Sequence, residues 1–337
     1  MSIITVGFNP AIDRILECRD FHIGGHQQAR QIARLAAGKA ANVNRALAQL
    51  GVDSIATGFV GANELQFFHE QLMAAGPEKG GGGCILCRFV EVGSATRENI
   101  TILDPDRHGK GGGETHLRDR GLSVTSEETC LLAQKLLHEL DVNTAAPPAS
   151  PSDPNIVVFA GSLCEGCRPD YFASLLDQCI AKGTKVVVDS SGESLRVAAT
   201  RNLWLLKPNL EEFRQLVGRE VPNTAAAICD AAAPCLKNIQ NLLISRGPMG
   251  ALLITPTGTW SGHLANNSLA TPIRTVGCGD HLLAGYLAAL TTTNHPPEAA
   301  FATALAVATA RALSPRMDEC DLSLIESSLA NIVIEKM

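Results

Sequence analysis

Short apolar runs alternate with helical patterns along most of the chain. The first run, IITVGF at 3–8, is rich in β-branched residues and leads into an Asn-Pro turn, which indicates a strand. Residues 40–50 follow with apolar side chains at helical spacing, and the run at 54–60 predicts the next strand. A strand, a helix and a strand in this order are typical of a parallel sheet flanked by helices.

The same alternation returns in the second half of the chain with clearer boundaries. The predicted strands are short apolar runs at 156–160, 185–188, 203–206, 242–245 and 251–254. The predicted helices cover 170–181, 280–290 and 298–312. Several of these strands end in polar residues or glycine. Because ligands bind at the carboxyl ends of strands in open parallel sheets, we expect the functional site at that edge.

Five segments do not fit this alternation. Two mixed segments, 14–35 and 84–103, are predicted to form a small accessory sheet. The glycine runs at 80–83 and 109–113 are typical of flexible surface loops, because they lack the Gly-Lys-Ser/Thr ending of a phosphate-binding P-loop. The proline-rich stretch at 145–154 indicates an extended linker.

Composition excludes several classes of protein. The 337 residues are 45% hydrophobic, enough for a large core, and the net charge of −6 argues against binding to nucleic acid. Aromatic residues make up only 4%, too few for stacking on single strands. No apolar run reaches the ~18 residues of a membrane span, and the N-terminus lacks the pattern of a signal peptide. We therefore expect a soluble, cytoplasmic protein with no nucleic-acid or membrane partner.

The eleven cysteines are scattered, which indicates reduced thiols rather than a disulfide framework. Cys164 and Cys167 have the spacing of half a zinc or redox site. Because no second pair at ligand spacing accompanies them in the sequence, we interpret both as loop thiols.

The strongest chemical signal is the stretch Thr275-Val276-Gly277-Cys278-Gly279-Asp280, which precedes an apolar helix. Its small residues allow the backbone to approach a ligand, and the helix start offers free N–H groups and a positive dipole end. Such a site suits the charge that develops on a transferred phosphoryl group. Asp280 could accept a proton from an attacking hydroxyl, or it could only cap the helix.

A second turn of small residues also leads into a helix. In the stretch Ala37-Gly38-Lys39-Ala40-Ala41-Asn42, Lys39 and Asn42 offer donors to an anionic or polyhydroxylated ligand. The order of the two motifs and their wide separation make the pair more specific than either motif alone.

In these two motifs the chain resembles the PfkB (ribokinase-like) family of carbohydrate kinases. Residues 37–43 match the first family signature, Gly-Gly-Lys-Gly-x-Asn-Val, and residues 275–280 match the second, Thr-Val-Gly-Ala-Gly-Asp. The resemblance covers nearly the whole chain and is closest to the branch that holds 1-phosphofructokinase and tagatose-6-phosphate kinase. Further matches to that branch lie at 9–13, 96–99, 161–163, 189–195, 207–212 and 244–251.

The resemblance implies an α/β fold of the ribokinase-like type. This is a three-layer α/β/α sandwich with a mostly parallel central sheet and a small β-sheet lid. Residues 1–337 would form a single kinase domain, with the lid built from about 14–35 and 84–103. In relatives the lid closes over the sugar. The resemblance also implies a homodimer that forms through the lid.

The resemblance also implies ATP-dependent phosphorylation of a hydroxyl of a hexose phosphate. The expected reaction converts fructose 1-phosphate to fructose 1,6-bisphosphate, with ATP as co-substrate and Mg²⁺ as cofactor. Two alternatives stay open: a kinase of an unphosphorylated sugar or nucleoside, and a non-catalytic sensor on the same scaffold. A Rossmann dehydrogenase is disfavoured, because no Gly-x-Gly-x-x-Gly follows the first strand.

The family's site residues carry over position by position. Asp280 resembles the catalytic base, with the amides of Gly277, Cys278 and Gly279 as its anion hole. The residues implied to bind the sugar are Asp13, Gly38, Lys39, Asn42 and Arg97, and Lys39 and Arg97 would contact its phosphate. The residues implied for ATP are Lys207, Asn209, Ser245, Gly247 and Gly250. Asn209 and Glu212 would support magnesium indirectly.

Several positions depart from the family pattern. Ala37 and Ala40 replace glycines, and each adds a methyl group near the sugar. The segment 26–30, where phosphosugar kinases carry lysine or arginine, keeps Arg30 and a histidine as basic residues. His281 replaces a small polar residue, and its imidazole could hydrogen-bond Asp280 or shift the pKa of that carboxyl group.

Overall fold

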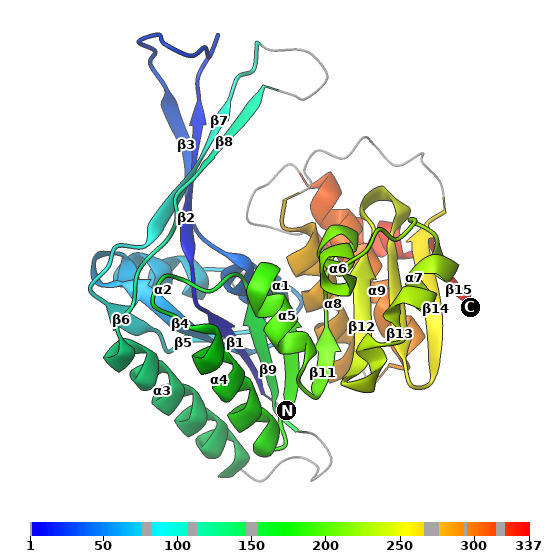
Figure 1. Ribbon diagram of the computed structural model, residues 1–337. Coiled ribbons are helices and arrows are strands. Elements are labelled where there is room, and N and C mark those ends of the chain that lie inside the picture. Colours follow the sequence, from blue (N-terminus) through cyan, green and yellow to red (C-terminus); the bar gives the residue numbers. More distant parts are fainter. Residues whose placement is uncertain are drawn as a thin grey trace.

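The computed structural model describes residues 2–75, 82–106, 113–145, 154–265, 276–292, 295–314 and 321–337. A central sheet runs through the molecule between two layers of helices, and a small second sheet projects from one end (Figure 1). This confirms the predicted three-layer α/β/α fold with a mostly parallel sheet and a small separate sheet.

The central sheet has the strand order β15-β14-β13-β12-β11-β10-β9-β1-β4-β5, and β6 also pairs with β4. From β12 to β5 and β6 neighbouring strands are parallel, whereas β13, β14 and β15 add an antiparallel edge. The bounds are β1 Ile3–Gly7, β4 Ser54–Gly61, β5 Ile85–Cys87, β6 Val90–Val92, β9 Ile156–Ala160, β10 Lys185–Asp189, β11 Leu203–Leu206, β12 Ile239–Ser245, β13 Ala251–Thr255, β14 Gly258–Leu264 and β15 Ile332–Lys336.

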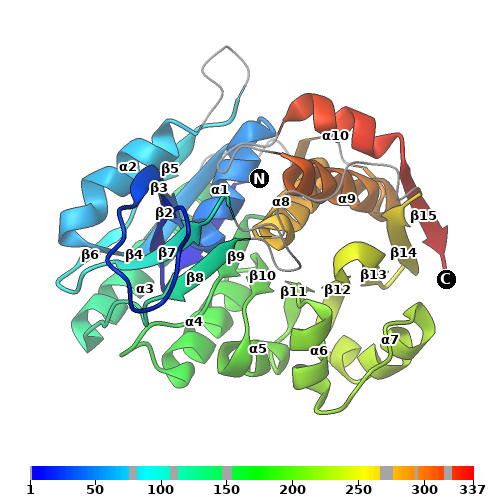
Figure 2. The same ribbon diagram turned by 90° about the horizontal axis from the view of Figure 1, so that it is seen from above.

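The helices divide between the two sides of this sheet (Figure 2). One side carries α1 (Lys39–Gln49), α2 (Leu65–Met73), α8 (Cys278–Thr292), α9 (Pro297–Leu313) and α10 (Leu322–Leu329). The other side carries α3 (Ser126–Ala145), α4 (Pro169–Ala181), α5 (Gly192–Ala199), α6 (Leu210–Val217) and α7 (Ala225–Ala232). Short 3₁₀ turns lie at Ala62–Glu64, Cys235–Lys237 and Gly247–Met249.

Side chains of the central strands alternate between two hydrophobic cores. Val6 and Phe159 belong to the core shared with α4 and α5, whereas Ile3 and Val158 belong to the core shared with α1, α8 and α9. Successive residues of a strand point to opposite faces, so a strand covered on both faces is apolar at every position. The continuous apolar runs in the sequence therefore reflect burial on both faces of the sheet.

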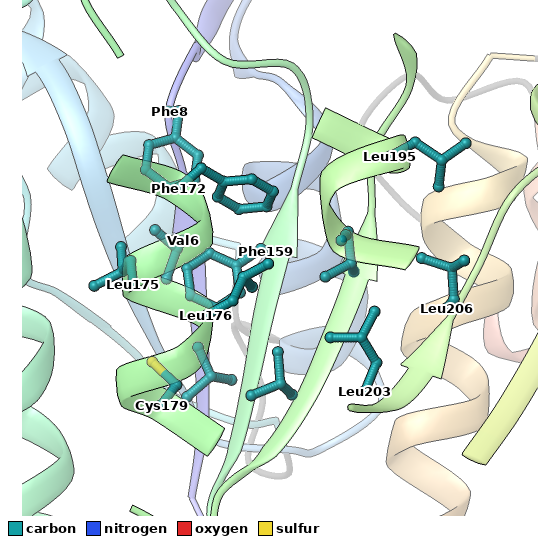
Figure 3. Packing of buried hydrophobic residues seen from close by; sticks show 14 of the residues in the cluster. Val6, Phe8, Phe159, Phe172, Leu175, Leu176, Cys179, Leu195, Leu203 and Leu206 are labelled. Atoms are coloured by element: carbon teal, nitrogen blue, oxygen red, sulfur yellow. The ribbon is translucent and has the colours of Figure 1, made fainter. Parts of the chain in front are cut away.

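The rings of Phe8, Phe159 and Phe172 lie together in the core on the side of the sheet that α4 covers (Figure 3), and Phe59 belongs to the same core. The ring centroids of Phe8, Phe159 and Phe172 are 5.6, 5.7 and 6.1 Å apart, and Phe59 lies 6.1 Å from Phe8. All four side chains are at most 1% exposed. Edge-on ring contacts add to the stabilisation that burial provides. The cluster fixes α4 against β1 and β9, two strands that end at the site described below.

The second sheet, which we call the lid, has the strand order β3-β2-β7-β8. Its strands are β2 Ala11–Glu17, β3 Arg30–Ala37, β7 Arg97–Leu103 and β8 Glu114–Arg118. β2 follows β1 after a short turn, and β3 leads through one residue into α1. The lid is therefore rooted where β1 ends, at the carboxyl edge of the central sheet (Figure 1).

The assignment of all of 84–103 to the lid is wrong for its first part. β5 and β6 pair with β4 and extend the central sheet, so only β7 of this segment joins the lid. The side chains of Ile85, Cys87, Val90 and Val92 are buried, and this burial holds β5 and β6 against the main core. The fourth lid strand, β8, was not predicted, because its ETHLR sequence has no apolar alternation.

Most other predicted elements are confirmed with small changes at their ends. The runs at 156–160 and 203–206 coincide with β9 and β11, and the helix predicted at 170–181 coincides with α4 apart from one residue. The glycine runs and the proline-rich linker fall largely outside the described residues. Cys164 and Cys167 are free thiols, as expected, but both are buried in the core. No helix in the described ranges is long and apolar enough to cross a bilayer.

Replacing Phe172 by alanine should lower the free energy of unfolding by about 3–5 kcal/mol, because it leaves a cavity in the ring cluster. Phe172→Leu keeps most of the volume and should cost about 1.5 kcal/mol or less. Urea denaturation followed by circular dichroism measures both. Met73→Ala, at a side chain that is 66% exposed, is the control. Equal transition midpoints for Phe172→Ala and Met73→Ala would contradict the importance of the cluster.

Candidate active site

The predicted site residues lie where the parallel strands of the central sheet end, beside the root of the lid. Asp189 ends β10, Lys207 follows β11 and Ser245 ends β12. The two signature motifs begin α1 and α8, which pack against each other. The sheet edge predicted from the sequence is therefore the place where these residues converge.

Asp280 and Asn42 join the two signature motifs directly. The Oδ2 atom of Asp280 accepts a hydrogen bond from Nδ2 of Asn42 at 2.7 Å, and the Asp280 residue is only 6% exposed. Burial and the negative charge of Asp189 raise the pKa of Asp280 to about 6, although Asn42 and nearby lysines oppose this change. Such a carboxylate is more basic than an ordinary aspartate and still ionised at neutral pH, which suits a general base.

A second buried carboxylate, which the sequence analysis did not assign to the site, is Asp189. Its Oδ1 lies 2.7 Å from Nζ of Lys39 and its Oδ2 lies 3.0 Å from Nζ of Lys207. Burial alone would raise the pKa of Asp189, but these two ammonium groups hold it below the ordinary value. Two positive charges thus share one negative charge at the base of the site. The signal in the sequence was an acid directly after the buried run KVVV.

Lys39 lies beside Asp189 at the bottom of the site rather than in open solvent. Its ammonium group is also 3.7 Å from Oε1 of Glu212. Burial acts to lower the pKa of Lys39, yet the charges of Asp189 and Glu212 raise it above the ordinary value, so the side chain stays protonated. A contact between Lys39 and the phosphate of a sugar would require the ammonium group to move away from Asp189.

The turn before α8 has the geometry expected of an anion site. Gly277 has a φ of +84°, a conformation that favours glycine. A Cβ atom built on Gly279 would lie 3.2 Å from Nζ of Lys207, so this ammonium group adjoins the backbone of the turn. Amides at a helix start have no partner within the helix and can bind an anion. Thr275, the first residue of the signature, lies outside the described residues.

His281 bonds the turn before α8 rather than Asp280. Its Nδ1 lies 2.9 Å from the carbonyl oxygen of Gly277, and because a carbonyl only accepts, Nδ1 carries the hydrogen and donates. The ring is 5% exposed. Burial lowers the pKa of His281 to about 4, and the charges of Arg311 and Arg45 act in the same direction. His281 is therefore neutral and fixes the backbone of Gly277.

The residues implied for ATP lie on two neighbouring strand ends. Asn209, just after β11, pairs with Ser245 of β12 in a parallel bridge. Gly247 and Gly250 form the turn from β12 to β13 with φ values of +61° and +79°. A Cβ atom on Gly250 would lie 2.0 Å from a backbone oxygen, so this turn requires glycine. Lys207 stands two residues before Asn209, which places all five residues at one stretch of the sheet edge.

Asn209 and Glu212 form a capping box at the start of α6. Oδ1 of Asn209 accepts from the N–H of Glu212, and Oε2 of Glu212 accepts from the N–H of Asn209, both at 2.8 Å. Oε1 of Glu212 lies 3.7 Å from Lys39, too far for a hydrogen bond, so it can accept one from water. In the described part of the chain no three acidic, histidine or cysteine side chains cluster as a direct metal site. These residues fit the predicted indirect support of magnesium.

The residues implied for the sugar lie at the root of the lid. Oδ1 of Asp13 in β2 accepts a hydrogen bond from Asn99 of β7 at 2.9 Å. Gly38 has a φ of +106°, and a Cβ atom on it would lie 3.3 Å from the Cα of Pro10. Arg97 donates from Nε to the carbonyl oxygen of Pro10 at 3.2 Å and from Nη2 to that of Asn9 at 3.1 Å. Among the described residues these contacts leave Nη1 of Arg97 available to an anion.

Two departures from the family pattern have simple structural outcomes. Ala37 and Ala40 are 3% and 8% exposed, so their extra methyl groups are buried. Arg30 in the segment 26–30 lies 3.3 Å from Glu17 on the exposed part of the lid, and its charge is balanced there.

Asp189→Asn should bring the pKa of Asp280 below about 6, because it removes a neighbouring negative charge and leaves the charges of Lys39 and Lys207 unbalanced. Carbon-13 NMR titration of labelled aspartate carboxyl groups measures this pKa without any substrate. Glu211→Gln, at an exposed carboxylate on α6, is the matched control and should change nothing. An unchanged or raised pKa in Asp189→Asn would contradict this description of the charges.

Comparison with known proteins agrees with this geometry. The profile of the "pfkB family carbohydrate kinase" matches residues 131–322, more than half of the chain. A 1-phosphofructokinase of Bacillus subtilis is 27% identical over 315 residues, which cover 94% of this chain and 94% of that protein. A tagatose-6-phosphate kinase of Staphylococcus epidermidis is 28% identical over 294 residues, 86% of this chain and 85% of that protein.

A solved structure supports the fold. Phosphofructokinase-2 from Escherichia coli, in complex with fructose-6-phosphate, superimposes with a TM-score of 0.81 at 21% identity over 98% of each chain. At this identity the likeness concerns the fold alone. The family match and the convergence of both signature motifs on one site identify this chain as a member of the pfkB family of carbohydrate kinases, which are phosphotransferases.

Proposed function

We propose that this protein transfers the γ-phosphoryl group of ATP to a hydroxyl group of a hexose phosphate, with fructose 1-phosphate as the expected substrate. The observation that carries the proposal is the buried carboxylate of Asp280, which lies in the first turn of α8 and accepts a hydrogen bond from Asn42. Support for a phosphorylated sugar comes from relatives named 1-phosphofructokinase and tagatose-6-phosphate kinase.

Asp280 acts in this proposal as the general base. Its carboxylate accepts the proton of the substrate hydroxyl while that oxygen attacks the γ-phosphorus. The bond between the γ-phosphorus and the bridging oxygen breaks, ADP leaves, and the proton stays on Asp280 until water removes it. The amides of Gly277, Cys278 and Gly279, together with Lys207, stabilise the charge on the transferred group.

Magnesium, when bound, neutralises part of the charge on the ATP phosphates. Glu212 would hold it through water, since its Oε2 is engaged in the capping box and its Oε1 is not. Ser245, Gly247 and Gly250 would line the nucleotide beside Asn209.

The phosphate of the sugar requires fixed positive charge near Asp13. Arg97, Asn99 and Arg118 share one face of the lid with Asp13, because Asp13 and Arg118 stand opposite Asn99 on its two neighbouring strands. Burial and repulsion from Arg118 lower the pKa of Arg97, whereas Asp13 opposes this change. Two arginines that repel each other on one face of the lid are suited to a phosphate group. They supply the charge that the segment 26–30 lacks.

The second candidate is a kinase of an unphosphorylated sugar. The observation in its favour is Arg30, the arginine of the segment 26–30, whose charge is balanced by its ion pair with Glu17.

We also propose that 1–337 act as one kinase domain and form a homodimer through the lid. The support is the strand order of the lid, in which β3 and β8 are outer strands with one neighbour each among the described residues. Outer strands present unpaired backbone groups that a second copy can bond.

Asp280→Asn should reduce kcat by about 10²- to 10⁴-fold, because asparagine cannot accept the proton. ADP release with Mg-ATP is measured across phosphorylated and free sugars. Asp170→Asn, an exposed carboxylate at the start of α4, is the control and should keep full activity. Turnover only on free sugars or nucleosides would exclude the hexose phosphate. Binding of ATP or sugar without turnover on any sugar would favour a sensor.

Arg118→Gln should raise KM for the hexose phosphate about tenfold and leave KM for ATP unchanged, because it removes one charge from the phosphate. The matched control is Arg14→Gln, since Arg14 lies in the same lid but forms an ion pair with Glu98 on the opposite face. Initial-rate kinetics measure both variants. Equal KM values for Arg118→Gln and the wild type would exclude this arginine from the phosphate site.

A further inference from the structure

Arg45 is a buried arginine of α1 that the reaction described above does not use. It is 6% exposed and lies one helical turn after Asn42. Its Nη1 donates to Oδ1 of Asn42 at 3.2 Å, and its Nη2 donates to the carbonyl oxygen of Ala36 at 2.6 Å. Ala36 is the next-to-last residue of β3 and directly precedes the first signature motif. One guanidinium group thus bonds both the root of the lid and the side chain that holds Asp280.

The amide group of Asn42 has one orientation that satisfies both of its neighbours. The ionised carboxylate of Asp280 only accepts hydrogen bonds, so it must face Nδ2. The guanidinium group of Arg45 only donates, so it must face Oδ1. A rotated amide would place two acceptors together and two donors together. Arg45 therefore stabilises the orientation in which Asn42 donates to Asp280.

We propose that Arg45 is a positioning residue, which acts through Asn42 to keep Asp280 ionised and is itself anchored on the lid strand β3. This inference rests on the proposed function, because Asp280 is the base of that reaction. Without Arg45, the amide of Asn42 can rotate, and its bond to Asp280 weakens. A carboxylate that loses a donor becomes harder to ionise, so Asp280 would require a higher pH to act as a base.

Other charged groups also face Asp280, and the test has to separate Arg45 from them. Asp189 disfavours ionisation, whereas Lys39 and Lys207 favour it. On α8 itself, Cys278 and His281 lie beside Asp280, and Arg311 of α9 faces both of them. Arg45 differs from Lys39 and Lys207 because it bonds the Asn42 side chain, so its effect should depend on that side chain.

The test is the pH dependence of kcat/KM for the sugar in wild type, Arg45→Met, Asn42→Ala and the double variant. Arg45→Met should move the acidic limb to a pH about one unit higher. At pH values below the limb kcat/KM should then be about tenfold lower than in the wild type, whereas above pH 8 it should change little. Asn42→Ala should move the limb by a similar amount. The double variant should move it no further than Asn42→Ala alone, because Arg45 acts through Asn42. Arg196→Met, at an exposed arginine of α5, should keep the wild-type profile.

Two results would overturn the proposal. One is a folded Arg45→Met whose acidic limb stays at the wild-type pH. The other is additive shifts in the double variant, which would mean that the charge of Arg45 acts on Asp280 directly. If Arg45→Met does not fold, Arg45→Lys replaces it: lysine keeps the charge but cannot bridge Ala36 and Asn42, so the limb should still rise. If Arg45→Lys folds and its acidic limb stays at the pH of the wild type, the proposal is contradicted.

Failure of the proposed function would look different. If the wild type phosphorylates no sugar, carbon-13 NMR titration of Asp280 in the same four proteins replaces the kinetic profile. The pKa of Asp280 should then rise in Arg45→Met but not rise further when Asn42 is already alanine. The relay from Arg45 can thus be confirmed or rejected independently of the reaction.

Discussion

Two buried carboxylates at one sheet edge impose the constraint that organises the rest of the site. Asp189 and Asp280 repel each other, and in a buried place such repulsion keeps one of them from ionising easily. Lys39 and Lys207 favour the ionised form of Asp189, because their ammonium groups lie 2.7 and 3.0 Å from its carboxylate oxygens. Among the described residues, Asp280 accepts its side-chain hydrogen bond from Asn42, and the two lysines only partly offset the burial and the charge of Asp189 that raise its pKa. It is thereby left as the more basic carboxylate, which is the property that a general base needs.

The fold supplies these groups from elements that are far apart in the sequence. α1 brings Lys39, Asn42 and Arg45, β10 brings Asp189, and α8 brings Asp280. Each group stands on an element that is largely buried, so the hydrophobic core fixes the polar groups in place. The lid is connected to the same point, because β3 ends beside α1 and Arg45 bonds its backbone. Through Arg45, a movement of the root of the lid would therefore reach Asn42.

The sequence allowed the central strands, the helices of both signatures and the location of the site to be predicted, because all depend on local patterns. Runs such as 156–160 are apolar over the whole strand, and the Gly-x-Gly-Asp turn has few structural alternatives. Asp189 was not recognised as a member of the site, since its two lysine partners approach from other elements. The bond from His281 to Gly277 was not foreseen, because a helical histidine can point several ways.

The lid shows the same limit. Its strands are only partly buried and mixed in polarity, so the alternation that reveals a half-buried strand is weak there. β5 and β6 were assigned to it because they are close in sequence to β7, although their buried side chains belong to the central sheet.

The pH dependence of kcat/KM for fructose 1-phosphate with Mg-ATP tests the central claim most directly. If buried Asp280 is the base, the rate should fall along an acidic limb near pH 6 and stay level through neutral pH. A limb near pH 4, where an ordinary aspartate ionises, or no limb at all, would contradict the role of this buried carboxylate.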